Sequence, residues 1–177
     1  MQVRVTTAGS LLVTVQEAAD YLNLDSNYPE LDNLIRSVQE KAEAYVQKSF
    51  TSRTVELVLD QSKDVIELPR YPVTAITSVK TLDESGTETT IATSTYYLPD
   101  QRRLVFTTWP ELTRDYGGLV ITYTAGSASE TPDAMKVGIL KALSTVFEHR
   151  EDFIVGASVA KLPDSSMSYF DTWRSLC

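Results

Sequence analysis

The stretch KSFTSRTVELVLD, Lys48 to Asp60, contains the point at which the chain changes from a helical pattern to a strand pattern. Before it, apolar residues recur every three or four positions, which is typical of an amphipathic helix. After it, apolar and polar side chains alternate, which is typical of a half-buried strand, with Val55, Leu57 and Leu59 on one face and Glu56 and Asp60 on the other. The sequence therefore predicts that a helical region ends near Phe50 and that a β region begins at Thr51.

Two helices are expected before this point. Thr14 and Glu17 stand at capping-box spacing, and the apolar residues that follow have helical period, which predicts a short helix at about 14–24. A longer apolar stripe predicts a second helix from Pro29 to about Phe50. The stripe consists of Leu31, Leu34, Ile35, Val38, Ala42, Tyr45, Val46 and Phe50. We interpret the charged row of Asp32, Arg36 and Glu40 as the solvated face of this helix.

The alternating pattern continues to Ala125. In LPRYPVTAITSVKTLD, Leu68 to Asp83, the prolines exclude a helix, and a strand follows them. Its expected faces carry Val73, Ala75, Thr77, Val79 and Thr81 on one side and Thr74, Ile76, Ser78, Lys80 and Leu82 on the other. Neither face is cleanly polar, so we expect both to contact protein. Further strands are expected around 65–68, 96–98, 103–107 and 119–124, and the short connections favour antiparallel pairing.

The helical period returns at TPDAMKVGILKALSTVFEHRED. Thr131 as N-cap and Pro132 at the first helical position predict a helix at about 132–151, which ends near the cations His149 and Arg150. The remainder, 153–177, is expected to be an arm without a core of its own. It carries Tyr169, Phe170, Trp173 and Leu176 at helical spacing.

This double change of period predicts an α+β fold, in which a small helical bundle carries an inserted antiparallel β lobe and a C-terminal arm. The N-terminal segment and the first helices of the bundle are expected in residues 1–50, and the inserted β lobe in 51–125. The closing helix of the bundle is expected in 126–152 and the arm in 153–177.

Composition limits the possible functions. The chain has 177 residues, 42% of them hydrophobic, which suits a globular protein with one good core, or one core with a lobe attached. Its net charge of −8 argues against a surface that grips a phosphate backbone. Cys177 is the only cysteine, so an intrachain disulfide and a multi-cysteine metal site are excluded. No apolar run has the length of a signal-peptide core or of a membrane helix, so we expect synthesis in the cytoplasm.

No convincing catalytic or cofactor motif is present in the sequence. His149 lies between charged residues at an expected helix end, where a capping or surface role is favoured. Asp83 and Glu84 are interpreted as turn residues at a hairpin tip rather than as an acid and base pair. Arg102 and Arg103 are interpreted as charges that protect an edge strand rather than as phosphate ligands. We therefore predict that no residue is catalytic and that none binds a cofactor or a metal.

The order of these segments resembles that of the phage head-to-tail connector proteins, also called adaptor or head-completion proteins, of long-tailed phages. The resemblance covers most of the chain. It rests on VTVQEAADYLNL, AEAYVQKSFTSRTVELVLD, IELPRYPVTAITSVKTLDESGT, RLVFTTWPE, LVITYTAGSA and TPDAMKVGILKALSTVFEHRED, in this order. The end of the chain, KLPDSSMSYFDTWRSLC, matches the family's closing arm only loosely, in a Leu-Pro pair and a final aromatic and arginine.

The resemblance implies a non-enzymatic structural protein of the virion, located in the phage neck. Such proteins form a homo-oligomeric ring, commonly a dodecamer, that docks on the portal protein after DNA packaging. The ring is then the platform for the next neck protein, a stopper or tail completion protein. DNA would pass through without specific binding, as the acidic composition also favours, and neither a cofactor nor a membrane is implied.

The arm contains the candidate partner-binding residues, which are Tyr169, Phe170, Trp173 and Arg174. Three aromatics within five residues are typical of anchors at interfaces. The alternative is that the arm folds back over its own helices. A second function also stays open, namely a non-enzymatic protein- or carbohydrate-binding β module with helical support, whereas a hydrolase has little support.

Overall fold

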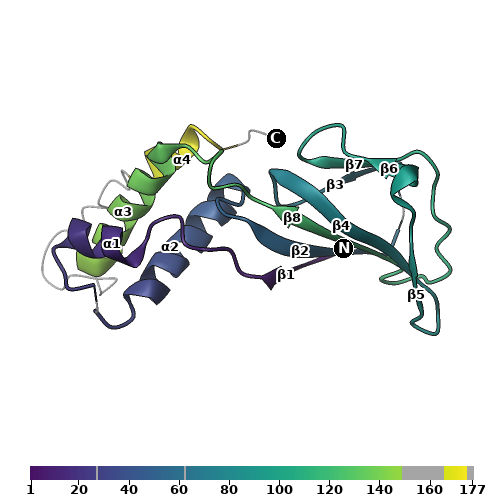
Figure 1. The fold of residues 1–177 in the computed structure, drawn as a ribbon, viewed down its shortest axis with the longest axis horizontal. Coiled ribbons are helices and arrows are strands. Elements are labelled where there is room, and N and C mark those ends of the chain that lie inside the picture. Colours follow the sequence, from purple (N-terminus) through teal and green to yellow (C-terminus); the bar gives the residue numbers. More distant parts are fainter. Residues whose placement is uncertain (27, 62, 149–165, 175–177) are drawn as a thin grey trace, which may run out of the picture. The chain divides into compact units, whose positions relative to one another are not determined.

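The computed structural model describes residues 1–26, 28–61, 63–148 and 166–174. The chain forms two compact units, and Figure 1 shows their elements. The β unit comprises Met1–Ser10 and Lys48–Ala128, and the helical unit comprises Leu11–Gln47 and Ser129–Cys177. The predicted α+β fold, with helices in one part and antiparallel strands in another, is confirmed.

Two antiparallel sheets build the β unit. The larger sheet has five strands in the order β1-β2-β8-β4-β5, and the smaller has three in the order β3-β7-β6. The strands are β1 (Gln2–Thr7), β2 (Arg53–Leu59), β3 (Val65–Glu67), β4 (Val73–Leu82), β5 (Glu88–Thr90), β6 (Tyr96–Tyr97), β7 (Arg103–Phe106) and β8 (Leu119–Ala125). A short 3-10 helix, η1 (Thr93–Thr95), leads into β6.

The two sheets share one apolar core. The central strand β8 alternates strictly, with Leu119, Ile121, Tyr123 and Ala125 buried. The neighbouring strand β2 adds Val55 and Leu57, and the smaller sheet adds Ile66, Leu104 and Phe106. The described core residues come from β2, β4 and β8 of the larger sheet, from β3 and β7 of the smaller sheet and from the segment before β4, and none lies on β1 or β5. These outer strands of the larger sheet therefore extend beyond the shared core.

β4 does not keep the strict alternation that the sequence predicted. Its pairing with β8 is irregular between Val73 and Ala75 and again between Ile76 and Ser78. Each irregularity adds one residue to β4 and reverses the side on which the following residues lie. Val73, Ile76 and Val79 therefore contribute to the core, whereas Ala75 and Thr77, which we expected beside Val73 and Val79, are exposed. The expected assignment of faces is wrong for this reason.

The first strand was not expected from the sequence. β1 pairs with β2, from Gln2 opposite Val58 to Val5 opposite Val55. Residues 1–10 therefore belong to the β unit, although we placed them with the helices in the segment 1–50. All six residues of β1 are exposed. Polar and apolar side chains do alternate from Gln2 to Val5, but the alternation is only four residues long and our prediction did not use it.

Four helices form the described part of the helical unit: α1 (Val15–Leu22), α2 (Leu31–Val46), α3 (Asp133–Glu148) and the short α4 (Met167–Asp171). The first three pack against one another, as expected. α2 ends earlier than predicted, because Gln47 adopts a left-handed conformation with φ of 60° and so stops the helix before Phe50. Within the described part of the chain, no helix is both long and apolar enough to cross a membrane.

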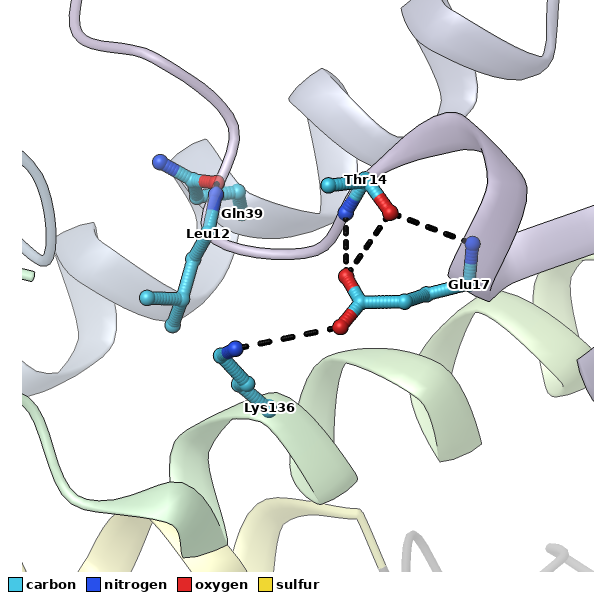
Figure 2. Close-up of polar contacts among 5 residues, drawn as sticks. All are labelled: Leu12, Thr14, Glu17, Gln39 and Lys136. Carbon is cyan, nitrogen blue, oxygen red and sulfur yellow. Dashed lines mark hydrogen bonds and ion pairs between the residues drawn. The ribbon is translucent and has the colours of Figure 1, made fainter.

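Polar contacts join α1 to α3 and the segment before α1 to α2 (Figure 2). The expected capping box is present, since Glu17 N donates to Thr14 Oγ1 at 3.1 Å and Thr14 N donates to Glu17 Oε2 at 2.7 Å. The hydrogen bond from the Thr14 N–H lowers the pKa of Glu17 most, and Lys136 of α3, 3.9 Å from Glu17 Oε1, lowers it further. Leu12 N donates to the buried Gln39 Oε1 at 2.8 Å, which fixes the entry to α1.

Candidate interaction site

The described part of the arm, residues 166–174, folds onto α2 and α3. Phe170 is only 1% exposed. Its ring fills a notch at Gly138 of α3, where an added Cβ would lie 2.8 Å from Phe170 Cε1 and 3.0 Å from Tyr169 Cβ. Gly138 is thus the position that lets α4 approach α3. Phe170, a candidate partner-binding residue, is a core residue of its own chain in this structure.

Tyr169 is the second candidate residue, and it packs on α3 from the edge of α4. Lys141 Nζ lies 4.8 Å from the centroid of the Tyr169 ring, which is the geometry of a cation–π contact. The hydrogen bond with Tyr169 raises the pKa of Lys141. Tyr169 is half-buried, so part of its side chain remains accessible.

Arg174, the third candidate residue, contacts α2. Its guanidinium carbon lies 4.7 Å from the centroid of the Tyr45 ring, and its Nη1 donates to the Tyr45 hydroxyl at 3.5 Å. The Tyr45 hydroxyl in turn donates to Asp171 Oδ1 at 2.5 Å. This hydrogen bond holds the proton on the phenol and raises the pKa of Tyr45. The network holds the end of α4 against α2.

Trp173 completes the candidate set and is half-buried just after α4. Its backbone N donates to Phe170 O at 3.1 Å, which continues the last turn. The four candidate residues therefore lie on α4 or just after it, but they face different ways: Phe170 points into the helical unit, Tyr169 and Trp173 lie at its surface, and Arg174 is exposed. Leu176 and His149 lie outside the described residues, and so does the start of the arm, where the sequence has the apolar run Phe153, Ile154 and Val155.

The β unit has an open pocket of about 1050 Å³ on the side of β1 and β3. Its lining includes Met1, Val65 and Tyr116, and the Tyr116 side chain is 78% exposed. Among the residues that the structure describes, no group of three His, Cys, Asp or Glu side chains is arranged to hold a metal ion. The sequence analysis missed this surface, because its apolar residues come from segments far apart in the chain.

Asp83, one of the two carboxylates that we considered at the hairpin tip, has a structural role. Asp83 Oδ1 accepts hydrogen bonds from Ser85 Oγ at 2.6 Å and from Thr87 N at 2.8 Å. The contact with Ser85 is the main reason that the pKa of Asp83 is lowered. Asp83 is thus the turn residue that its position indicated.

Arg102 and Arg103 do not protect an edge strand, and that interpretation was wrong. β7, which begins at Arg103, is the central strand of its sheet, with β3 on one side and β6 on the other. Arg103 pairs with Asp100 at 2.6 Å. The Arg102 guanidinium lies 5.1 Å from the centroid of the buried Tyr71 ring and 3.7 Å from Glu67.

Comparisons with known proteins identify similar chains only among solved structures. No protein-family model matches the chain, and no curated protein matches it in sequence. One matching chain comes from the neck of an empty gene transfer agent particle, computed with C6 symmetry. It is 26% identical, with a TM-score of 0.79, and the match covers 100% of this chain and 97% of that one.

A chain from the virion of a native gene transfer agent particle is also 26% identical, with the same coverage of 100% and 97% and a TM-score of 0.75. A chain from the neck of a native particle, computed with C12 symmetry, is 24% identical over the same shares of 100% and 97%, with a TM-score of 0.81. This protein therefore has, along its whole length, the structure of neck components of phage-like particles, which confirms its resemblance to the head-to-tail connector proteins.

Proposed function

We propose that this protein is the adaptor of a phage or phage-like neck, a non-enzymatic subunit that forms a ring on the portal protein. The observation that carries the proposal is the match at 26% identity and 100% coverage to a chain of a gene transfer agent neck. Because both units of the chain take part in this match, it supports a role for the whole protein rather than for one shared domain. The subunit is made in the host cytoplasm and is incorporated into the virion.

The ring contains many copies of this chain, and a dodecamer is the expected number. The similar chains come from necks computed with C6 and C12 symmetry, and a dodecamer is compatible with both. The net charge of −8 per subunit suits a ring through which DNA passes without specific binding, because like charges suppress contact with the phosphate backbone. The opposite face of the ring is the platform for a stopper or tail completion protein.

The arm is the element that contacts the portal protein or a neighbouring subunit. Phe170 seats α4 on the helical unit, and this leaves Trp173 and Arg174 at the surface as the contacting residues, with Tyr169 beside them. An aromatic and an arginine are the residue types that most often dominate interface energies. The short helix α4 would then act as a rigid support for these two side chains.

A protein- or carbohydrate-binding module is the second candidate function. The open pocket of the β unit favours it, because Tyr116, which is 78% exposed, offers an aromatic surface beside Met1 and Val65. Such a module would bind its ligand as a single subunit. Ring assembly therefore separates the two candidates.

The test is to mix the purified protein with the portal protein of the same particle and to examine the product by negative-stain microscopy and native mass spectrometry. We expect a ring of this chain stacked on the portal ring, with a mass that gives the number of subunits. A protein that remains a single subunit in the presence of the portal and leaves the portal undecorated contradicts the proposal. Binding of a glycan or peptide by that single subunit would support the second candidate.

A further inference from the structure

Among the described residues, β1 is an outer strand of the five-stranded sheet and pairs only with β2, beside which Figure 1 shows it in purple. Proteins usually protect such an edge with inward-pointing charges, proline or bulges, because its unpaired N–H and C=O groups are a template for another strand. In β1 the one charged side chain, Arg4, lies on the outer face, 3.7 Å from Glu56 of β2. The strand QVRVTT has no proline, and its pairing becomes irregular only after Val5. Within the described part of the chain, no strand pairs with the outer edge of residues 2–5.

The inner face of β1 is apolar and uncovered. Val3 and Val5 lie opposite Leu57 and Val55, which are fully buried, yet Val3 and Val5 are 38% and 43% exposed. The reason is that the larger sheet extends beyond the smaller one, so the shared core does not reach β1. The open pocket continues this surface, since Met1, just before β1, and Val65 of β3 line it together.

The β5 and β6 side of the β unit offers a second pair of free strand edges. β5 is the other outer strand of the five-stranded sheet, and all three of its residues are exposed. η1 follows shortly after β5 and runs directly into β6, the edge of the smaller sheet on which Tyr97 is 51% exposed. In the part of the chain that the structure describes, each side of the β unit therefore combines an outer strand with an exposed apolar side chain.

We propose that these two sides are the subunit interface of the ring. The β1 and β3 side of one copy contacts the β5 and β6 side of the next copy. β1 adds to the neighbour's sheet edge by backbone hydrogen bonds, and Val3 and Val5 are covered by the neighbour, with Tyr97 as the apolar side chain that reaches them. This inference rests on the proposed function, because it assumes that copies of this chain form a closed ring.

A second copy of this chain is the occupant that fits both sides. A ring with more than two subunits closes only through a heterologous contact, in which one patch meets a different patch on the neighbour. Pairing of β1 with β1 of another copy would instead give a closed dimer. A head-to-tail contact removes both free edges of the larger sheet from every subunit at once, which is how assemblies avoid unlimited edge-to-edge pairing.

Substitution of the inner face of β1 tests the proposal. Val3→Lys with Val5→Lys places two inward-pointing charges on the edge, and we expect a folded subunit that no longer forms the ring, alone or on the portal. Gln2→Lys, on the outer face of the same strand, is the matched control and should assemble like the parent. Tyr97→Lys, on the opposite side, should lose the ring as the double variant does. Circular dichroism and thermal unfolding establish that each variant is folded.

Hydrogen exchange on the parent protein tests the backbone contact without any substitution. We expect the amides of residues 2–7 to exchange more slowly in the assembled ring than in the free subunit. Unchanged exchange there overturns the proposal. If the double lysine variant does not fold, the variant with Val3→Thr and Val5→Thr replaces it, because it removes the apolar contact and keeps the β propensity. Normal ring assembly by this threonine variant also overturns the proposed interface.

The same experiment separates this inference from the proposed function. If the parent and the double lysine variant both form rings on the portal, the interface lies elsewhere and the adaptor role stands. If the parent neither forms a ring nor binds the portal, the adaptor role fails, and the interface fails with it.

Discussion

At the scale of single residues, the contact between Gly138 and Phe170 fixes the position at which the arm packs on α3. A side chain at position 138 would occupy the volume that the Phe170 ring fills, since an added Cβ would lie 2.8 Å from the ring. The absence of a side chain on α3 therefore creates the site for an aromatic that lies 32 positions later in the chain. Glycine weakens a helix, so its place inside α3 is explained by this packing.

Phe170→Ala should destabilise the helical unit. Truncation of a fully buried aromatic typically costs about 3–5 kcal/mol, because a cavity remains. Urea unfolding followed by circular dichroism measures the loss. Thr172→Ala, an exposed position on the same segment, is the control and should change stability by less than about 0.5 kcal/mol. Equal stability of the Phe170 variant and the parent would mean that the arm is not part of the core in solution.

Gly138→Ala tests the same contact from the other side. In an open helix this change stabilises by about 1 kcal/mol, but here the new methyl group meets the Phe170 ring, so we expect a loss of about 1–3 kcal/mol. Adding Phe170→Leu, whose smaller side chain makes room, should recover part of that loss. A Gly138→Ala variant that is more stable than the parent would contradict the close packing of Phe170 against position 138.

At the scale of elements, patterns among neighbouring residues predict α1 well and the faces of β4 poorly. α1 begins at a capping box that involves residues only three positions apart, so its start can be read from the sequence. β4 contains two irregularities in its pairing with β8, and these depend on a strand about 45 residues away. The side on which a β4 residue lies is therefore set by its partner strand.

The irregular pairing of β4 makes a prediction that differs from strict alternation. Val79→Ala should cost about 2 kcal/mol, because Val79 is fully buried and loses two methyl groups. Ala75→Lys and Thr77→Lys should each change stability by less than about 0.5 kcal/mol, because both positions are exposed. Denaturant unfolding of the three variants measures the difference. A large loss of stability in the Ala75→Lys variant would instead support strict alternation along β4, with Ala75 on the buried face.

Glu17 should make the helical unit sensitive to acid. Its folded pKa is lowered below the ordinary value of 4.5, so its contribution to stability is present above that value and is lost as pH falls through the folded pKa. Glu17→Gln should therefore lose stability at neutral pH and show a smaller decrease on acidification than the parent. Thr14→Ala, which removes the side-chain cap, should cost about 1 kcal/mol at pH 7. Thermal unfolding between pH 3 and 7 tests both, and parallel pH profiles for parent and Glu17→Gln would contradict the prediction.

At the scale of the whole molecule, each unit offers a different kind of contact surface. The β unit has free strand edges with exposed valines, which suit pairing with copies of itself. The helical unit carries Trp173 and Arg174 just after the short helix α4, which Phe170 anchors. The proposed contact within the ring and the proposed contact of the arm therefore lie on different units.

Trp173→Ala should weaken binding to the portal protein without unfolding the subunit. Truncation of an interface anchor of this type typically costs about 2 kcal/mol, which corresponds to a decrease in affinity of about 30-fold. Binding is measured by surface plasmon resonance with immobilised portal rings, and circular dichroism establishes the fold. Ser168→Ala, an exposed position on the other side of Phe170 in the sequence, is the control. Unchanged affinity of the Trp173 variant would mean that the arm is not the portal contact.

Periodicity within the sequence was enough to predict the α+β class, the three longer helices and most strands of the two sheets. It also indicated turn roles for residues such as Asp83, because these features depend on side chains a few positions apart. Tertiary structure decided what depends on distant residues: the place of β1 beside β2, the irregular pairing of β4, the central position of β7 and the burial of Phe170 against Gly138. The partner of an edge strand, a bulge and a notch at a glycine each depend on another segment that packs there. Local patterns therefore do not encode them.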